Sequence, residues 1–235
     1  MTEQCVKEFE GLEVVTFDHY NTLQHSAETQ EDIIHPVVRS LKTRIDLDEE
    51  RFLEEYVEKD ERYRRNLHET HVETSLDELI LEALIDSGHG CPGLPAKVEA
   101  SVDHGLRTRR LAWYPDAEET LLHLRDRGYR LGLISNTHWR LLPERRRELT
   151  RFFDAITLSY EHGYAKPHPS IFHAAAMRLG AEPGRCLHVG DDPVADVWGA
   201  RNARMRAAYV KRNELEAEAD VVIQRLTELK PYLDK

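Results

Sequence analysis

The stretch VVTFDHYNTL, residues 14–23, ends an apolar run on a carboxylate. Its first four residues are apolar or β-branched, which is typical of a buried β-strand, and Asp18 follows them directly. A charged residue rarely serves packing at the end of such a strand. The pattern therefore predicts that Asp18 is a reactive group presented at a strand tip, just before an Asn-Thr turn.

Five further runs of the same character predict more strands. They are residues 130–135, 155–159, 186–190, 207–210 and 220–223. Helical patterns lie between them, and two of these patterns close with a glycine. Strands that alternate with helices predict an α/β fold, with a Rossmann-like parallel sheet flanked by helices. In such sheets, functional sites form at the carboxyl ends of the strands.

Residues 24–112 interrupt this alternation. They hold almost no strand pattern, but long helical patterns occur at 47–67 and 75–88. We interpret the segment as an α-helical cap domain, inserted shortly after the first strand. The predicted division is a core of residues 1–23 and 113–235, with residues 24–112 as the cap.

The composition narrows the class of protein and its partners. The chain has 235 residues, of which 40% are apolar and 32% charged, as in globular proteins. A net charge of −11 argues against nucleic acid as a partner, because binding phosphates needs a basic face. No apolar run is long enough to span a bilayer. We expect a small-molecule substrate, no membrane partner, and either a monomer or a homodimer.

Two features of the sequence point to the cytoplasm. The acidic N-terminus lacks the apolar stretch of a secretory signal. The three cysteines, Cys5, Cys91 and Cys186, are scattered and form no CxxC pattern, which predicts reduced thiols. We therefore expect a cytoplasmic protein.

Polar residues gather at the ends of the predicted strands. Besides Asp18, they are Ser135, Asn136, Lys166, Asp191, Asp192 and Asp196. A single parallel sheet could bring all of them to one edge. Asp192 precedes a proline and also fits a helix N-cap, whereas Asp196 alone could merely complement a helix dipole.

Four segments together resemble the motifs of the haloacid dehalogenase-like (HAD) hydrolase superfamily. FDHYNTL, LISN, KPHPSIF and GDDPVAD follow one another in the order and with the spacing of those motifs. Residues 24–112 occupy the place of the family's helical cap, of the C1 type, after the first motif. The resemblance implies a hydrolase with a Rossmann-like core and an aspartate nucleophile.

The resemblance also implies how the nucleophile and a metal would work together. Asp18 would attack the substrate and form a covalent intermediate that water then hydrolyses. Asp18, Asp191 and the backbone carbonyl of Tyr20 would hold Mg²⁺, a cation that prefers oxygen ligands. Asp192 would support this group from the start of the following helix.

The remaining residues of the motifs would bind the group that is transferred. Ser135, the backbone at Asn136, and Thr22 would contact it. Lys166 would neutralise its negative charge, and Asp196 would hold Lys166 or a metal-bound water.

Tyr20 separates two predictions about the reaction. Phosphatases of the superfamily usually carry an aspartate there as general acid and base, whereas a tyrosine is similar to the 2-haloacid dehalogenases, which need no proton donor. Those enzymes use a cap arginine against the substrate carboxylate, and Arg65 or Arg64 could be placed similarly. The adjacent Asp191 and Asp192 would repel such a carboxylate unless a cation lay between them.

We therefore expect an Mg²⁺-dependent phosphatase acting on a small phosphorylated metabolite, with a 2-haloacid dehalogenase as the alternative. A non-catalytic relative that binds a phosphorylated ligand or a partner protein is a third interpretation. A phosphatase with Tyr20 must take its proton from another side chain, and His19, His68 and His71 are the candidates.

Overall fold

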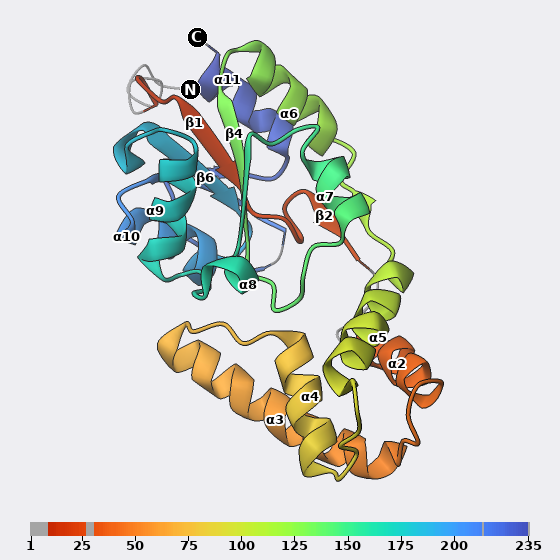
Figure 1. Ribbon diagram of the computed structural model, residues 1–235. Coiled ribbons are helices and arrows are strands. Elements are labelled where there is room, and N and C mark those ends of the chain that lie inside the picture. Colours follow the sequence, from red (N-terminus) through yellow and green to blue (C-terminus); the bar gives the residue numbers. More distant parts are fainter. Residues whose placement is uncertain (1–8, 27–30, 213, 235) are drawn as a thin grey trace.

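The computed structural model describes residues 9–26, 31–212 and 214–234. Its central sheet has six strands, all of them expected from the sequence, and every neighbouring pair is parallel. Their order across the sheet is β5 (Ala155–Leu158), β4 (Arg130–Ser135), β1 (Val14–Phe17), β6 (Cys186–Gly190), β7 (Arg206–Val210) and β8 (Val221–Ile223). Strand β1 is therefore central, and its carboxyl end lies between those of β4 and β6 (Figure 1).

Helices cover both faces of this sheet, as the alternating pattern predicted. One face carries α6 (Ala117–Asp126), α7 (Pro143–Leu149), η3 (Leu226–Leu229) and α11 (Lys230–Leu233). The other carries α9 (Pro169–Arg178), the π-helical turn η2 (Pro193–Trp198) and α10 (Gly199–Asn202). Short turns α8 (Ser159–His162) and η1 (Pro183–Arg185) complete the core.

Strand β1 contributes side chains to the hydrophobic clusters on both faces of the sheet, because its successive side chains point to opposite faces. Val15 and Phe17 join the cluster on the α6 face, whereas Val14 joins the one on the α9 face. All three side chains are fully buried, and burying each one contributes roughly 1.5–3 kcal/mol. This packing holds the strand that carries Asp18 rigidly in the middle of the core.

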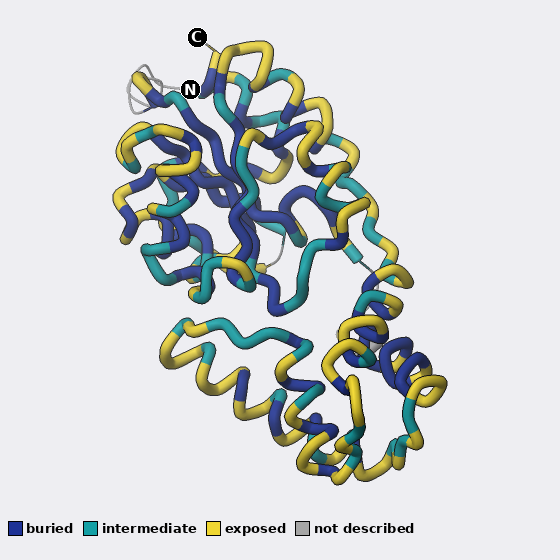
Figure 2. The backbone as a smooth tube through the Cα atoms, in the orientation of Figure 1, coloured by how far each residue is buried: buried dark blue, intermediate teal, exposed yellow. Residues whose placement is uncertain are grey.

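Four helices make up most of the inserted segment. They are α2 (Glu31–Lys42), α3 (Glu49–Thr70), α4 (Leu76–Asp86) and α5 (Leu94–Thr108), and they share a hydrophobic cluster separate from those of the sheet. Their inward faces are buried and their outward faces exposed (Figure 2). Ser75 begins α4 with a capping box that pairs it with Glu78. All four helices fall within residues 24–112, and we propose that range as the cap domain.

A short two-stranded sheet, which the sequence did not predict, lies where the inserted segment joins the core. Strand β2 (Gln24–His25) pairs antiparallel with β3 (Ala112–Trp113). The chain thus enters and leaves the helical segment at the same place, directly after the turn that follows Asp18. The two-residue length of each strand explains why no strand pattern was visible.

The cap touches the two loops of the core that carry predicted site residues. Beyond β4, the His138 carbonyl accepts a hydrogen bond from the Leu76 amide at 2.6 Å. Before α9, the Ala165 amide donates to the His71 carbonyl at 2.8 Å, one residue ahead of Lys166. Movements of the cap would therefore act directly on the loops beside Asn136 and Lys166.

Two expectations about the class of protein can be compared with the structure. In the described ranges, no helix combines the length and the apolar character that crossing a bilayer requires. Cys91 and Cys186 are both free thiols, as predicted. Cys5 lies outside the described residues.

Candidate active site

Asp18 lies at the carboxyl end of the central strand, as expected. Its backbone N–H donates to the Val189 carbonyl at 2.8 Å, which continues the β1–β6 ladder up to the carboxylate. The residue is only 8% exposed. Burial raises the pKa of Asp18 to about 6, while the neighbouring Lys166 ammonium opposes that rise.

A tight turn follows Asp18 and explains the unusual asparagine of the first motif. Asn21 has φ +59°, in the left-handed region that only glycine and asparagine adopt at low cost. Its amide donates to the Gln24 carbonyl at 2.7 Å. Thr22 then points its hydroxyl at Asp191 Oδ1, 3.2 Å away. The structure thus places Thr22 against a predicted metal ligand, where it orients that carboxylate.

Lys166 links the first and fourth motifs. Its Nζ donates to Asp18 Oδ1 and to Asp196 Oδ1, each at 2.6 Å, and the residue is 5% exposed. Burial opposes the charge of the ammonium, yet the two carboxylates together hold the pKa of Lys166 above its ordinary value. The lysine therefore stays charged and neutralises part of the negative charge around Asp18.

The second motif supplies one unpaired hydroxyl and one side chain that binds the backbone of Lys166. Ser135 ends β4, and its buried Oγ has no hydrogen-bond partner among the described residues, so this hydroxyl is available to bond a ligand oxygen. The Asn136 side chain instead grips the backbone of Lys166, donating to its carbonyl at 2.9 Å and accepting from its amide at 2.7 Å. Only the backbone of Asn136 is left for the predicted contact with the substrate.

Three carboxylates converge at the edge of the sheet. One oxygen from each of Asp18, Asp191 and Asp196 lies within 4.8 Å of the others. Burial, followed by repulsion from Asp18 and Asp196, raises the pKa of Asp191 to about 7. Oxygen ligands with excess negative charge fit a hard divalent cation, so these residues could hold a metal.

Asp192 and Asp196 have different functions in the structure. Asp192 is the N-cap of η2, and its Oδ1 accepts from the amides of Val194 (2.8 Å) and Ala195 (2.7 Å), as the Asp-Pro pair predicted. Asp196 is fully buried and accepts a hydrogen bond from Lys166, so it does more than complement a helix dipole. The predicted metal ligands that remain free of such bonds to Lys166 are Asp191 and the backbone carbonyl of Tyr20.

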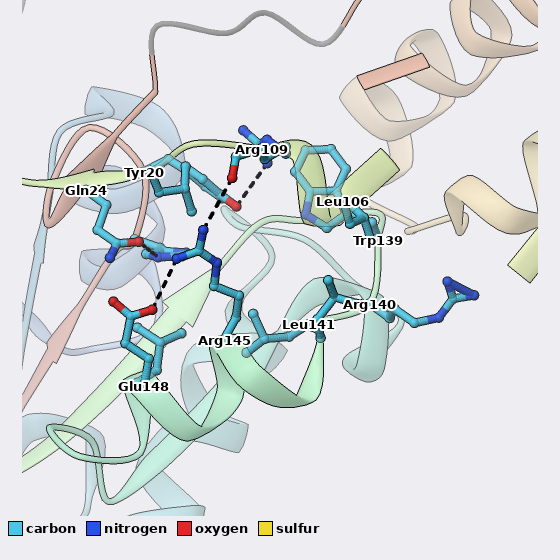
Figure 3. A pocket seen from close by; sticks show the side chains of 13 residues that line it. Tyr20, Gln24, Leu106, Arg109, Trp139, Arg140, Leu141, Arg145 and Glu148 are labelled. Carbon is cyan, nitrogen blue, oxygen red and sulfur yellow. Dashed lines mark hydrogen bonds and ion pairs between the residues drawn. The ribbon is translucent and has the colours of Figure 1, made fainter. Parts of the chain in front are cut away.

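The Tyr20 side chain points into a pocket formed with residues that sequence reasoning missed. Its hydroxyl accepts a hydrogen bond from Arg109 Nη1 at 3.1 Å (Figure 3). The Arg109 guanidinium carbon lies 5.0 Å from the Tyr20 ring centroid and 4.7 Å from that of Trp139, so it contacts both rings. Arg109 directly follows α5. Its hydrogen bond therefore links Tyr20, two residues after Asp18, to the segment that returns from the cap.

The structure does not bring Arg65 into this cluster, contrary to the prediction that it binds substrate. The Arg65 side chain is 66% exposed and pairs with Glu61 on its own helix. Arg64 likewise pairs with Asp60, one turn earlier. Both arginines belong to a charged helix surface, where i,i+4 partners satisfy them. Arg109 is instead the arginine that lies beside Tyr20.

The three candidate histidines lie in different surroundings. His19 is buried in the Tyr20 pocket and bonded to Gln24 at 2.8 Å, and burial lowers its pKa to about 4. His68 and His71 line a cleft of about 940 Å³ together with Lys166. A proton donor in the cap is therefore to be sought at the end of α3.

Comparison with known proteins agrees with this arrangement. A sequence profile of haloacid dehalogenase-like hydrolases matches residues 12–204, and the chain belongs to this family. A glyceraldehyde 3-phosphate phosphatase of Methanopyrus kandleri is 30% identical over 87% of this chain and 86% of its own length. A phosphoserine phosphatase of Thermus thermophilus is 34% identical over 63% of this chain, but the match spans only 61% of that protein.

Solved structures with similar folds come from both kinds of enzyme. A 2-haloacid dehalogenase of Pseudomonas syringae has a TM-score of 0.72 and 25% identity, covering 94% of this chain and 98% of its own. A HAD phosphatase of Thermococcus onnurineus has a TM-score of 0.57 and 28% identity at the same coverage. The fold therefore leaves the choice of reaction to the residues of the site.

Proposed function

We propose that this chain is an Mg²⁺-dependent phosphatase acting on a small phosphorylated metabolite. The observation that carries the proposal is the closeness of Asp18 and Asp191, with carboxylate oxygens within 4.8 Å. Two such charges repel by roughly 3–4 kcal/mol at an effective dielectric constant of about 20. A bound cation removes that repulsion, and the names of the Methanopyrus and Thermus relatives support a phosphate ester as the substrate.

The carboxylates of Asp18 and Asp191 would hold Mg²⁺, which supplies positive charge to the oxygens of the transferring phosphoryl group. Asp18 attacks phosphorus in line, so that a bond forms from its oxygen while the bond to the leaving oxygen breaks. Ser135 and Lys166 hold the phosphoryl oxygens. Water then hydrolyses the aspartyl phosphate, which releases inorganic phosphate and regenerates Asp18.

His71 is our candidate for the missing general acid. It caps α3 in the left-handed conformation, with φ +58°, and its Nδ1 lies 3.2 Å from the Leu67 carbonyl. Because a carbonyl only accepts, Nδ1 carries a proton, and Nε2 is left to exchange one with the substrate. The hydrogen bond from Ala165 fixes this residue next to the Lys166 loop.

A substitution at His71 tests this assignment. His71→Asn should lower kcat by about 10²–10⁴-fold for alkyl phosphates and far less for p-nitrophenyl phosphate, whose leaving group needs no proton. His68→Asn, which alters the other cleft histidine, is the matched control. Equal losses for both kinds of ester in His71→Asn would contradict the assignment.

A 2-haloacid dehalogenase is the second candidate. Tyr20 and the similarity to the Pseudomonas syringae enzyme favour it, and Arg109 places a cation beside that tyrosine. A non-catalytic relative is the third, but the intact contacts of Lys166 with Asp18 and Asp196 argue against decay of the site.

One set of assays separates the three. Phosphate release from p-nitrophenyl phosphate is measured with and without EDTA, beside halide release from 2-chloropropionate, for wild type and Asp18→Asn. The phosphatase proposal expects EDTA-sensitive phosphate release that Asp18→Asn abolishes. Metal-independent halide release would support the dehalogenase instead. A folded protein silent in both assays would support the non-catalytic interpretation.

We also propose the remaining expectations for the chain as a whole. Its partner would be a small phosphate ester, and it would act in the cytoplasm as a monomer or a homodimer. The free thiols of Cys91 and Cys186 are consistent with a reducing compartment. Gel filtration with light scattering would determine the oligomeric state.

A further inference from the structure

We infer that His188 is a positioning residue for the reaction, acting on Lys166 through Asp196. Its Nε2 lies 3.2 Å from Asp196 Oδ1, the same oxygen that receives the Lys166 ammonium at 2.6 Å. His188 lies on β6 and is 1% exposed. The inference rests on the proposed phosphatase function.

A closed ring of buried contacts includes the nucleophile, Asp18. Thr16 Oγ1 lies 2.9 Å from His188 Nδ1, and the two residues are register partners on β1 and β6. From His188 the contacts pass to Asp196 and Lys166, and the lysine returns to Asp18, only two residues beyond Thr16. The strand that presents the nucleophile is thus also the strand that anchors the histidine.

Hydrogen-bond logic fixes the form of the imidazole. Asp196 can only accept, so Nε2 of His188 carries a proton. Nδ1 faces the Thr16 hydroxyl, which also lies 3.3 Å from the Leu187 carbonyl. Phe172 packs edge-on against the imidazole at 5.1 Å and 85°, which restrains its rotation.

Hydrogen bonds and close packing fix the position of the Asp196 carboxylate. Its Oδ2 accepts from the Asp192 amide at 3.0 Å, while Oδ1 serves both Lys166 and His188. A Cβ atom at Gly190 would lie 2.2 Å from Asp196 Cγ, so the carboxylate packs directly on the end of β6. His188 and Gly190 lie two residues apart on one face of that strand, and both define where Asp196 sits.

The function of this arrangement follows from the charge of Asp18. When Asp18 becomes an aspartyl phosphate, it loses its own carboxylate charge, and Asp196 is the carboxylate that still pairs with the Lys166 ammonium while the lysine faces the phosphoryl group. A carboxylate fixed by His188 keeps the ammonium aimed at the phosphoryl group. Without this donor, the same carboxylate would hold the lysine less accurately, and the loss would appear in kcat.

Four variants test the inference. His188→Met removes the donor, His188→Gln keeps an N–H close to the Nε2 position, and Thr16→Val removes the hydroxyl that faces Nδ1. Ile171→Val shortens a side chain in the hydrophobic cluster that contains Phe172, without altering the ring of contacts, and serves as the control. Steady-state kinetics with p-nitrophenyl phosphate, Mg²⁺ activation curves and thermal unfolding are compared for all four.

We expect His188→Met to lower kcat about tenfold, the size typical of losing one hydrogen bond to a charged group, with KM and the Mg²⁺ requirement unchanged. His188→Gln should stay within about threefold of wild type, Thr16→Val should lie between the two, and Ile171→Val should match wild type in kcat. Wild-type kcat in His188→Met, or equal losses in His188→Met and His188→Gln, would overturn the inference.

An inactive wild type would defeat the proposed function, and the inference is then decided by spectroscopy. Long-range ¹H–¹⁵N correlations of histidine-labelled protein report the tautomer of His188, assigned by the signal missing from His188→Met. We expect a protonated Nε2 in wild type. A proton on Nδ1 alone, which would direct a lone pair at Asp196, would overturn the inference independently of any activity.

Discussion

Lys166 Nζ and Asp196 Oδ1 are 2.6 Å apart, in an ion pair whose two side chains are each 2% exposed. The lysine makes a second contact of the same length with Asp18. The two carboxylates differ during the proposed reaction, because only Asp18 is covalently modified before it is regenerated. The permanent partner of the lysine is therefore Asp196.

Removing the lysine charge should damage both activity and stability. Lys166→Met leaves Asp18 and Asp196 buried without a cation, and breaking a buried pair in this way costs about 3–5 kcal/mol of unfolding free energy. We expect kcat to fall by at least about 10³-fold, since the charge that faces the phosphoryl group is lost. Urea titration and steady-state kinetics measure the two effects. Full activity in a folded Lys166→Met protein would contradict the assigned role.

A single methyl group at Gly190 should displace Asp196. The added Cβ would lie 2.2 Å from the carboxylate carbon, so Gly190→Ala should lower the unfolding free energy by about 1–3 kcal/mol and lower kcat as Lys166 loses its partner. Gly184→Ala is the matched control, because a Cβ there meets no heavy atom within 4 Å. If both variants behaved alike, the close packing of Asp196 on β6 would be unimportant.

Arg109 and Arg65 should respond differently to the same change. Arg109→Met removes the hydrogen bond to Tyr20 and the contacts with two aromatic rings, which should cost about 1–2 kcal/mol and reduce kcat/KM. Arg65→Met alters an exposed side chain and should change stability by less than about 0.5 kcal/mol, with normal activity. The opposite ranking of the two variants would restore Arg65 as the substrate ligand.

Acid should destabilise the protein partly through His138. This histidine is 8% exposed, its ring contacts those of Tyr63 and Trp139, and burial lowers its pKa from 6.5 to about 4. A depressed histidine pKa stabilises the fold fully above pH 6.5, and the contribution is lost as the pH falls toward 4, because the unfolded chain binds the proton first.

The difference between wild type and His138→Phe isolates that contribution. As the pH falls from 6.5 to 4, the wild type should lose up to about 3 kcal/mol of unfolding free energy relative to the variant, near 1.4 kcal/mol per pH unit. Denaturant titrations across this range provide the values. Parallel pH profiles for the two proteins would show that His138 titrates normally in the folded state.

The sheet and the convergence of its polar residues could be predicted because both follow from local patterns. Short β-branched runs specify strands, and parallel strands bring their carboxyl ends to one edge. Asp18, Lys166 and Asp191 therefore meet in space although the chain separates them widely. The Asp-Pro pair at residue 192 similarly marks a helix start, whatever the rest of the fold does.

Other features depend on contacts that no local pattern encodes. Tyr20 and Arg109 are 89 positions apart, and a basic residue after a helix has no distinctive neighbour in the sequence. Arg65 looked suitable because it lies in the cap, but the side of α3 it occupies is set by helix packing. His188 left one visible signal, a histidine within an otherwise apolar central strand, and its partner Thr16 was hidden in another strand.

The most direct test of the central claim is to trap the bond that Asp18 forms. Enzyme turning over p-nitrophenyl phosphate with Mg²⁺ is quenched in acid, digested, and examined by mass spectrometry for a phosphoryl group on the peptide that contains Asp18. We expect that peptide to carry the phosphoryl group in wild type, and Asp18→Asn to carry none. Phosphate release with an unmodified Asp18 peptide, or a phosphoryl group on another residue, would contradict the assignment of Asp18 as the nucleophile.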